Sequence, residues 1–322
     1  MEATLHLLRL TLGLLFALFS AASLAQYPTK PVRLVIHFPV GGSTDLVART
    51  LAQALTESLG QPVVVENKLG ADGAIAAAQV IQSAPDGYTL FLATNTPMMQ
   101  VPLLQKNPPY DPVAAFTPIS LVGRYTFLLV TTPALPAKTM GELISYARSN
   151  PGKLNFATYS GASQLAYAQI VKTANVDMLR VPYKGEAPAV TDILGGSIHA
   201  VFATPTSTLA HIKEGRLRAL AVTLPTRWPL LPEVPTTVEA GMPPISVEFF
   251  AALFGPAKMP AEIATRLSKE LNLIMARPQV REQIDRHGFA LAGSTPEELG
   301  LFVREQLGAW SRGFREAGIN PE

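Results

Sequence analysis

Two short stretches of the sequence have the residue types needed to hold an anion. The first is "FPVGGSTD", residues 38–45, and the second is "YSGAS", residues 159–163. In both, glycine and hydroxyl residues lie between an apolar run and a helix-like pattern. N–H groups at a helix start lack partners within the helix, the helix dipole favours negative charge there, and glycine allows a close approach. Each stretch could therefore bind a carboxylate or phosphate group, or could simply be a turn.

Two further strand ends add polar residues to this candidate site. Thr94 and Asn95 follow one expected strand, and Thr204 follows another. Open α/β sheets bind ligands beside the carboxyl ends of their strands. Asp45 would either accept hydrogen bonds from nearby main-chain donors or meet a ligand ammonium group. The residues predicted to bind the ligand are Phe38, Gly41, Gly42, Ser43, Thr44, Asp45, Thr94, Asn95, Tyr159, Ser160, Gly161, Ser163 and Thr204.

The sequence gives little support for chemistry beyond binding. The absence of cysteine excludes disulfides, thiolate metal sites and a cysteine nucleophile. The five histidines are not paired at metal-ligand spacing, and the Walker and G-x-S-x-G patterns are absent. We therefore expect no enzyme, no cofactor and no metal. An exported hydrolase remains an alternative, because Ser43, Ser160 or Ser163 could act as a nucleophile if a histidine lay within hydrogen-bond reach.

Composition indicates a folded protein with room for two domains. The chain has 322 residues, of which 48% are hydrophobic and 16% charged. Its net charge of +2, from 26 basic and 24 acidic residues, gives no electrostatic argument for a nucleic-acid or membrane-surface partner. We expect a monomer that binds a small molecule.

The first 25 residues are predicted to be a cleavable signal peptide. The apolar run from Leu10 to Ala22 is too short to cross a bilayer comfortably, which argues against the alternative of a retained anchor. Ser23 and Ala25 occupy the two positions that a signal peptidase recognises. We therefore expect cleavage after Ala25 and a soluble product in the periplasm.

Strand and helix patterns alternate through the rest of the chain. The apolar run at residues 32–38 is typical of a buried parallel strand, and Val47, Leu51, Leu55 and Leu59 form one face of the helix after it. Continued alternation predicts the α/β class, with a sheet flanked by helices in each domain, and the first βαβαβ series predicts parallel strands. Near the end, Thr295, Pro296 and Glu298 have the spacing of a helix-starting capping box.

Two long extended segments, at residues 119–132 and 245–257, suggest hinges between domains. We expect the first hinge at Gly123 and Arg124. Domain 1 would then comprise residues 26–124 and 246–322, with domain 2, residues 125–245, inserted between them. Two such connections suit closure of the domains around a ligand.

Several segments, in order, resemble one known family. "YPTKPVRLVIHFPVGGSTDLVARTLAQAL", "VPYKGEAPAVTDILGGSIHAVF" and "LPEVPTTVEAGMP" are similar to segments of the Bug family, the substrate-binding proteins of tripartite tricarboxylate transporters. The resemblance covers residues 26–317. It implies a two-lobed, type II periplasmic binding protein fold that closes on a small carboxylate. It also implies that residues 38–45 and 159–163 clamp one carboxylate through backbone donors and bound water.

The sequence departs from the family pattern at three places. His37 stands where the family usually has proline, and the loop at residues 159–163 is shorter than usual. Ala203 and Thr204 stand near a position where many members have an aspartate, which would suit a ligand amine. Its absence argues against an amino acid and for a dicarboxylate, a tricarboxylate or an aromatic acid. The resemblance implies membrane transporter subunits as partners, and a sensor kinase is the alternative.

Overall fold

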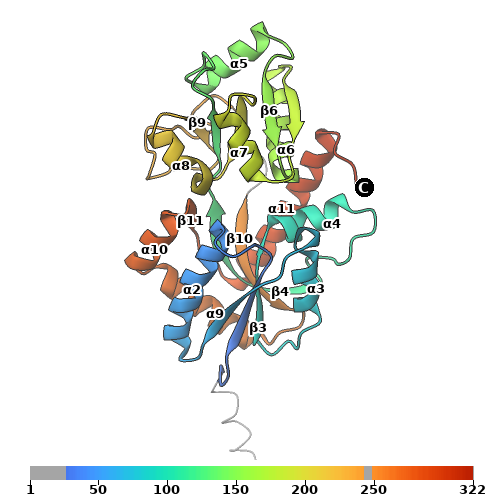
Figure 1. Ribbon diagram of the computed structural model, residues 1–322. Helices are drawn as coiled ribbons and strands as arrows, with labels where there is room; N and C mark the ends of the chain where they lie inside the picture. Colours follow the sequence, from blue (N-terminus) through green and yellow to red (C-terminus); the bar gives the residue numbers. More distant parts are fainter. Residues whose placement is uncertain (1–26, 243–248, 322) are drawn as a thin grey trace, which may run out of the picture.

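The protein has two lobes, each built on its own β-sheet. A computed structural model describes residues 27–242 and 249–321. Figure 1 shows the smaller sheet above the larger one, with the middle of the chain in the upper lobe, the start of the described chain at the bottom, and the C-terminus at the side near the level where the lobes meet. The predicted signal peptide, its cleavage after Ala25, and the predicted return to domain 1 at residue 246 all lie outside the described residues.

The larger sheet has six strands in the order β11-β4-β10-β3-β1-β2. β1 pairs in parallel with β2 and β3, whereas β10 is antiparallel to both β3 and β4. The strands are β1 (Val32–Ile36), β2 (Val63–Asn67), β3 (Thr89–Thr94), β4 (Phe116–Tyr125), β10 (Phe250–Pro256) and β11 (Phe289–Leu291).

The smaller sheet has five strands in the order β7-β6-β8-β5-β9. β6 pairs in parallel with β7 and β8, and β5 is antiparallel to β8 and β9. The strands are β5 (Leu128–Thr131), β6 (Asn155–Thr158), β7 (Leu179–Pro182), β8 (Ala200–Ala203) and β9 (Arg218–Val222).

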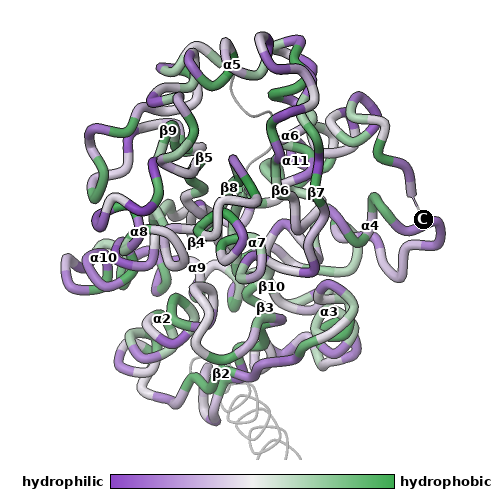
Figure 2. The backbone as a smooth tube through the Cα atoms, turned by 45° about the horizontal axis from the view of Figure 1, so that its top comes forward, coloured by the Kyte–Doolittle hydropathy of each residue, from purple (hydrophilic) through white to green (hydrophobic). Residues whose placement is uncertain are grey.

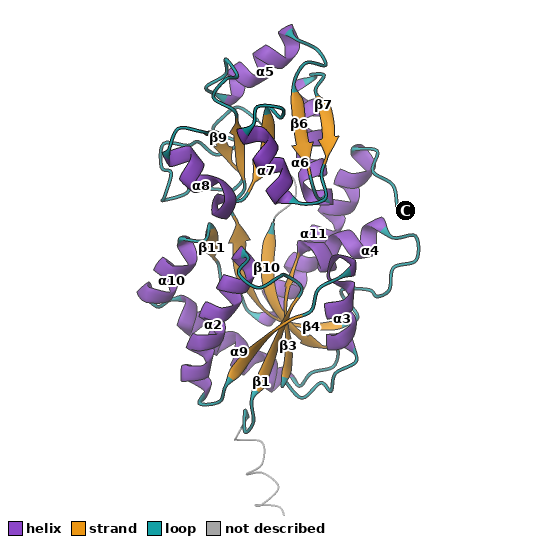
Figure 3. Ribbon diagram, in the orientation of Figure 1, coloured by secondary structure: helices purple, strands orange, loops and turns teal. Residues whose placement is uncertain are grey.

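Helices flank both sheets, as Figure 3 shows, which confirms the predicted α/β class and the two-lobed arrangement. Among the described residues, no helix is both long and apolar enough to cross a membrane. The α-helices are α2 (Ser43–Leu59), α3 (Ala74–Ile81), α4 (Val101–Leu104), α5 (Met140–Ser149), α6 (Gly161–Ala174), α7 (Glu186–Leu194), α8 (Pro205–Lys213), α9 (Ala261–Met275), α10 (Pro278–Asp285) and α11 (Pro296–Glu316). Two further short helices are η2 (Ala71–Gly73) and η3 (Thr96–Gln100).

The sheets are mixed rather than purely parallel, and the crossings between the lobes explain why. β1 and β3 run toward the other lobe, and β10 enters the larger sheet from that side, so it must run against β3. In the same way β5 enters the smaller sheet from the larger one and runs against β8. The predicted parallel arrangement of the first βαβαβ series is confirmed for β1, β2 and β3, and the crossing strands, for which no direction was predicted, are antiparallel.

The first crossing lies slightly later in the chain than we expected. β4 continues through Gly123 and Arg124 to Tyr125, and the next strand begins at Leu128. Gly123 is needed because β11 approaches closely. A Cβ atom at that position would lie 2.2 Å from the carbonyl oxygen of Ala290. The glycine therefore permits strand pairing, and the break in the sheet falls at residues 126–127.

Helix α2 has the apolar face that its sequence predicts. Val47, Leu51, Leu55 and Leu59 are all buried in the core of the larger lobe. Each such side chain contributes roughly 1.5–3 kcal/mol to folding. The helix ends at Gly60, which adopts φ 70° and donates its N–H to the carbonyl of Thr56. This packing fixes the direction in which the start of α2 points.

The last helix, α11, ties the two lobes together. It starts with the predicted capping box, in which Thr295 accepts a hydrogen bond from the main chain of Glu298 and Glu298 reaches back to Thr295. Trp310 is buried beside Phe249, with ring centroids 6.1 Å apart. Further along, Gly313 packs against Leu165 of α6, and a Cβ there would approach Leu165 to 3.1 Å.

Hydropathy follows this layout. Figure 2 shows hydrophobic colour in much of the central strands, while much of the hydrophilic colour lies in the outer helices and loops. Four elements were not predicted from the sequence, namely the short helices η3 and α4, the helix α10 and the strand β11. All are short, so none contains enough residues for a clear hydrophobic period.

His37 is buried in the larger lobe. Its Nε2 lies 3.3 Å from the hydroxyl of Thr94, and its ring fills the space that a side chain at Gly73 would need. Burial lowers the pKa of His37 to about 3. The imidazole is therefore neutral in the folded protein near neutral pH.

We expect His37 to make the protein less stable in mild acid. Below the ordinary histidine pKa of about 6.5 the unfolded chain takes up a proton that the folded chain does not, so stability falls with pH until about pH 3. His37→Gln removes this titration and should reduce the stability lost between pH 7.5 and pH 5 by about 2 kcal/mol, measured by denaturant unfolding. His211→Gln, outside the core, is the control. An unchanged loss in His37→Gln would contradict the prediction.

Candidate ligand-binding site

A cavity of about 530 Å³ lies between the two lobes. Residues from the larger sheet, from loops of both lobes and from the starts of four helices line it. Nine of the thirteen residues predicted to bind the ligand are among them: Phe38, Gly42, Ser43, Thr44, Thr94, Asn95, Tyr159, Ser160 and Thr204. The two loops that the sequence analysis singled out therefore face one space.

The start of α2 forms one wall of the cavity. Gly42 is the residue before the helix, and no side chain caps this end. The nearby hydroxyls have other partners: Ser43 donates to the carbonyl of His287 at 3.1 Å, and Thr44 shares a hydrogen bond of 2.5 Å with Tyr125. The first N–H groups of this 17-residue helix therefore remain available to a ligand in the cavity.

Asp45 and Gly41 shape the loop and do not line the cavity. The buried Asp45 carboxylate accepts hydrogen bonds from the N–H of Gly41, from Arg49 and from Asn67, at 2.8–2.9 Å. Burial alone would raise the pKa of Asp45, but these hydrogen bonds outweigh it and lower the pKa. Of the two roles considered for Asp45, pairing with nearby donors is the one the geometry favours.

The start of α6 forms the opposite wall. Ser160 and Ser163 make a reciprocal capping box, and Ser163 also accepts the N–H of Tyr159 at 2.8 Å. Ser163 and Gly161 do not line the cavity, whereas Ser160 and Ala162 do. The box pairs the N–H groups of Ser160 and Ser163. The N–H groups of Gly161 and Ala162, in the first turn of the helix, lack helical partners.

Gln100, which was not predicted from the sequence, lies between these two walls. It belongs to η3, and its side-chain oxygen would be 3.0 Å from a Cβ at Gly161. The residue is 7% exposed, and its Nε2 has no hydrogen-bond partner among the described residues. A buried donor without a partner costs free energy, so the amide is suited to a ligand acceptor in the cavity.

Glu186 is the other polar residue that sequence analysis missed. It opens α7, and its carboxylate accepts hydrogen bonds from the N–H of Thr204 at 2.6 Å and the hydroxyl of Thr204 at 2.9 Å. Ser207 also donates to it. Burial and then the charge of Glu186 raise the pKa of the Tyr159 hydroxyl well above its ordinary value. This part of the cavity is therefore negative.

The remaining wall is largely aromatic. Phe127 and Phe249 pack with ring centroids 4.4 Å apart and ring planes tilted by 40°, and Tyr125 contacts Phe289 edge-on at 4.7 Å. Among the described lining residues there is no lysine and no arginine. The lining residues that were not predicted are Pro39, Thr96, Gln100, Tyr125, Phe127, Ala162, Glu186, Ala187, Thr206, Ser207 and Phe249.

The serines of the site do not have the surroundings of a nucleophile. Ser43 donates to a backbone carbonyl, and Ser160 and Ser163 hydrogen-bond to each other. No histidine side chain is among the described residues that line the cavity. The requirement for a histidine within reach of one of these serines is therefore not met in this geometry. The described residues also contain no group of three or more histidine, aspartate or glutamate side chains that could hold a metal ion.

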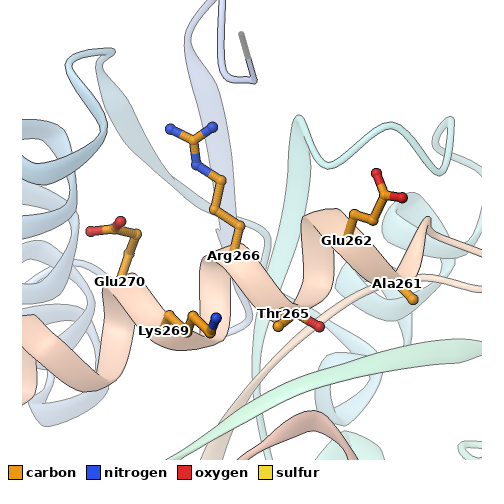
Figure 4. Close-up of a pocket in the computed structure, with 6 residues that line it drawn as sticks. All are labelled: Ala261, Glu262, Thr265, Arg266, Lys269 and Glu270. Atoms are coloured by element: carbon orange, nitrogen blue, oxygen red, sulfur yellow. The ribbon is translucent and has the colours of Figure 1, made fainter. Parts of the chain in front are cut away.

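A second hollow, of about 440 Å³, has a different character. Its lining comes from α9 alone, and Figure 4 shows Glu262, Arg266, Lys269 and Glu270 along that one helix. Two acidic and two basic side chains lie there on the solvent side. No element of the smaller lobe contributes, so this hollow is less suited to a ligand that both lobes enclose.

Comparison with known proteins extends these observations. The family model described as tripartite tricarboxylate transporter family receptor matches residues 47–319. Protein BugT of Bordetella pertussis is 35% identical over 297 residues, which is 91% of this chain and 90% of BugT.

Two similar solved structures contain acids. An R. palustris protein solved with adipate is 32% identical, with a TM-score of 0.81 over 92% of this chain and 100% of that chain. MatC from Rhodopseudomonas palustris, solved with bound malate, is 29% identical, with a TM-score of 0.73 over 89% of this chain and 99% of that chain. The similarity therefore includes both lobes.

The paired glycines of the first loop allow a test of its role. Gly42 has φ −72°, and a Cβ there meets only the carbonyl oxygen of Pro39 at 3.4 Å, so valine fits the backbone but projects at the cavity wall. We expect Gly42→Val to change the free energy of unfolding by about 1 kcal/mol or less. The same change should abolish ligand-induced thermal stabilisation.

Gly41→Val is the matched control. Gly41 has φ +84° and does not line the cavity, so valine should cost about 1–3 kcal/mol of stability through backbone strain. Differential scanning fluorimetry with and without a stabilising ligand measures both effects. Full ligand stabilisation of Gly42→Val would rule out the proposed contact.

Proposed function

The chain belongs to the tripartite tricarboxylate transporter family of receptors, and from this premise we propose that it captures a small carboxylate in the cavity between its lobes. The sequence-based assignment to the Bug family is confirmed by this membership, as is the expectation that the chain is a solute-binding protein and not an enzyme. The proposed ligand class is a dicarboxylate, a tricarboxylate or an aromatic acid.

One observation carries this proposal: the starts of two helices, one from each lobe, have first-turn N–H groups without helical partners beside one cavity, and the described lining of that cavity has no cationic side chain. The start of α2 and the start of α6 come from different lobes and face the same space. The unpaired amide of Gln100 lies beside them. A carboxylate accepts several N–H bonds at once, and helix starts favour negative charge. The acids bound by the two solved relatives are consistent with this class.

We further propose that the protein works outside the cytoplasm and delivers its ligand to membrane subunits of a tripartite transporter. In this proposal residues 1–25 are the signal peptide, with cleavage after Ala25. The inserted domain 2, expected at residues 125–245, begins in this proposal at the break at residues 126–127, because β4 of the larger sheet extends to Tyr125, and the remainder of the exported chain forms domain 1. The monomer closes around the ligand, and the transporter subunits bind the closed form.

A screen of carboxylates by thermal shift tests the proposal. A bound ligand stabilises the folded state by RT ln(1 + [L]/Kd), about 2.7 kcal/mol at a hundredfold excess over Kd. For a protein of this size that should raise the melting temperature by several degrees. We expect at least one small carboxylate to give this shift in protein purified from cells expressing the full chain.

The primary amide of each stabilising acid serves as its control. The amide keeps the size of the acid and removes the negative charge, so it should give little or no shift. Equal stabilisation by acid and amide would contradict the role of the helix starts. No shift with any carboxylate would contradict the proposed function itself.

A further inference from the structure

We propose that Glu186 makes the cavity select a monocarboxylate whose opposite end carries a hydroxyl or ammonium donor, in preference to a dicarboxylate of the same size. This inference rests on the proposed function, because it requires that a carboxylate binds in the cavity. Within the proposed class it favours hydroxy- or amino-substituted aromatic acids over dicarboxylates and tricarboxylates, and it adds linear monocarboxylates with a donor at the far end. It gives one side chain the role of excluding a second acid group.

The cavity has two helix starts that lack an anion and two that already have one. Residues at the starts of α2, α6, α7 and α8 all line it. The first turn of α6 contains no acidic residue. The first turn of α2 contains Asp45, but its carboxylate accepts hydrogen bonds from Gly41, Arg49 and Asn67 and does not line the cavity. In α7 the first residue is Glu186 itself. The cavity therefore has an end that attracts a carboxylate and an end that supplies one.

The Glu186 carboxylate also occupies the start of α8. The side chain of Thr204, the N-cap residue of α8, does not cap the main chain of the helix, and the N–H of Thr204 donates to Glu186. The recorded donors, Thr204 and Ser207, all bond to Oε1. Oε2 accepts none of these three bonds. Although the Tyr159 hydroxyl also interacts with the Glu186 side chain, a carboxylate oxygen has two lone pairs, so Oε2 can accept a hydrogen bond from a ligand. These contacts hold the carboxylate at a fixed place in the wall.

No cation among the described lining residues neutralises this carboxylate. A second acid group on the ligand would therefore face Glu186 in a partly buried space, where like charges repel more strongly than in water. The neutral Tyr159 hydroxyl nearby does not offset the charge. A hydroxyl or ammonium group at the same place would instead donate to Glu186.

The aromatic wall of the cavity suits an apolar body between the two ends of the ligand. Phe127 and Phe249 pack beside the polar groups, and Tyr125 uses its hydroxyl on Thr44. Such side chains contact an apolar body through their faces and edges. The ligand class that fits is thus an acid group, an apolar linear or aromatic body, and a donor at the far end.

Two matched series of probes test the inference, with affinities from isothermal titration calorimetry. The first is 6-aminohexanoate, adipate and hexanoate, and the second is 4-hydroxybenzoate, terephthalate and benzoate. Within each series only the far end changes. In at least one series we expect the donor-bearing acid to bind roughly tenfold or more tightly than the dicarboxylate.

Glu186→Gln keeps the shape and removes the charge. We expect it to weaken or reverse the preference by about tenfold, chiefly through tighter binding of the dicarboxylate. Asp192→Asn is the matched control, because Asp192 is an acidic residue of the same helix that accepts a hydrogen bond from Tyr183 and does not line the cavity. That variant should keep the preference of the unmodified protein.

Two results would overturn the inference while leaving the proposed function intact. One is tighter or equal binding of the dicarboxylate in both series by the unmodified protein. The other is an unchanged preference in Glu186→Gln, with the thermal unfolding of the free variant confirming that it is folded. Absence of binding by every acid in both series and in the wider screen would instead remove the proposed function, and this inference with it.

Discussion

The N–H groups of a helix's first turn cannot pair within that helix, and the site of this protein depends on that constraint. α2 and α6 each present such groups to the same cavity from different lobes. Most of the fold fixes the position and direction of these N–H groups. The buried face of α2 packs on the larger sheet, β4 and β5 carry the chain from one lobe to the other, and α11 packs against α6 at Gly313. The proposed carboxylate site therefore depends on the whole architecture rather than on one side chain.

Much of this could be predicted from the sequence because it is written in local patterns. The four-residue spacing of Val47, Leu51, Leu55 and Leu59 identified α2, and the glycine and hydroxyl residues beside it identified its start as a binding loop. The capping box at Thr295 was equally local. What could not be predicted was direction: a strand that enters a sheet from the neighbouring lobe has the same apolar pattern as a parallel one, so β5 and β10 gave no signal of being antiparallel.

The missed site residues show the same limit. Gln100 belongs to a short turn after β3, and Glu186 belongs to an ordinary helix start well before β8 in the sequence. Neither has a local pattern that indicates a ligand. Their roles arise from contacts across the chain, where Gln100 meets Gly161 and Glu186 bonds to Thr204. Asp45 illustrates the converse, since its position beside the glycines suggested a ligand contact, whereas its hydrogen bonds stabilise the loop.

The composition of the cavity wall has a consequence for how cargo would leave. Lysine and arginine are missing from the described lining, so no long, flexible cation can follow the acid group outward as the lobes part. Main-chain N–H groups are fixed to their helices. When the lobes separate by a few ångströms, all the N–H groups of one lobe therefore move out of hydrogen-bond distance of the ligand at once. The affinity for the ligand should therefore fall steeply over a small separation of the lobes, instead of decreasing gradually. A carrier built in this way can hold its cargo firmly in transit and still discharge it quickly when a membrane partner pulls the lobes apart.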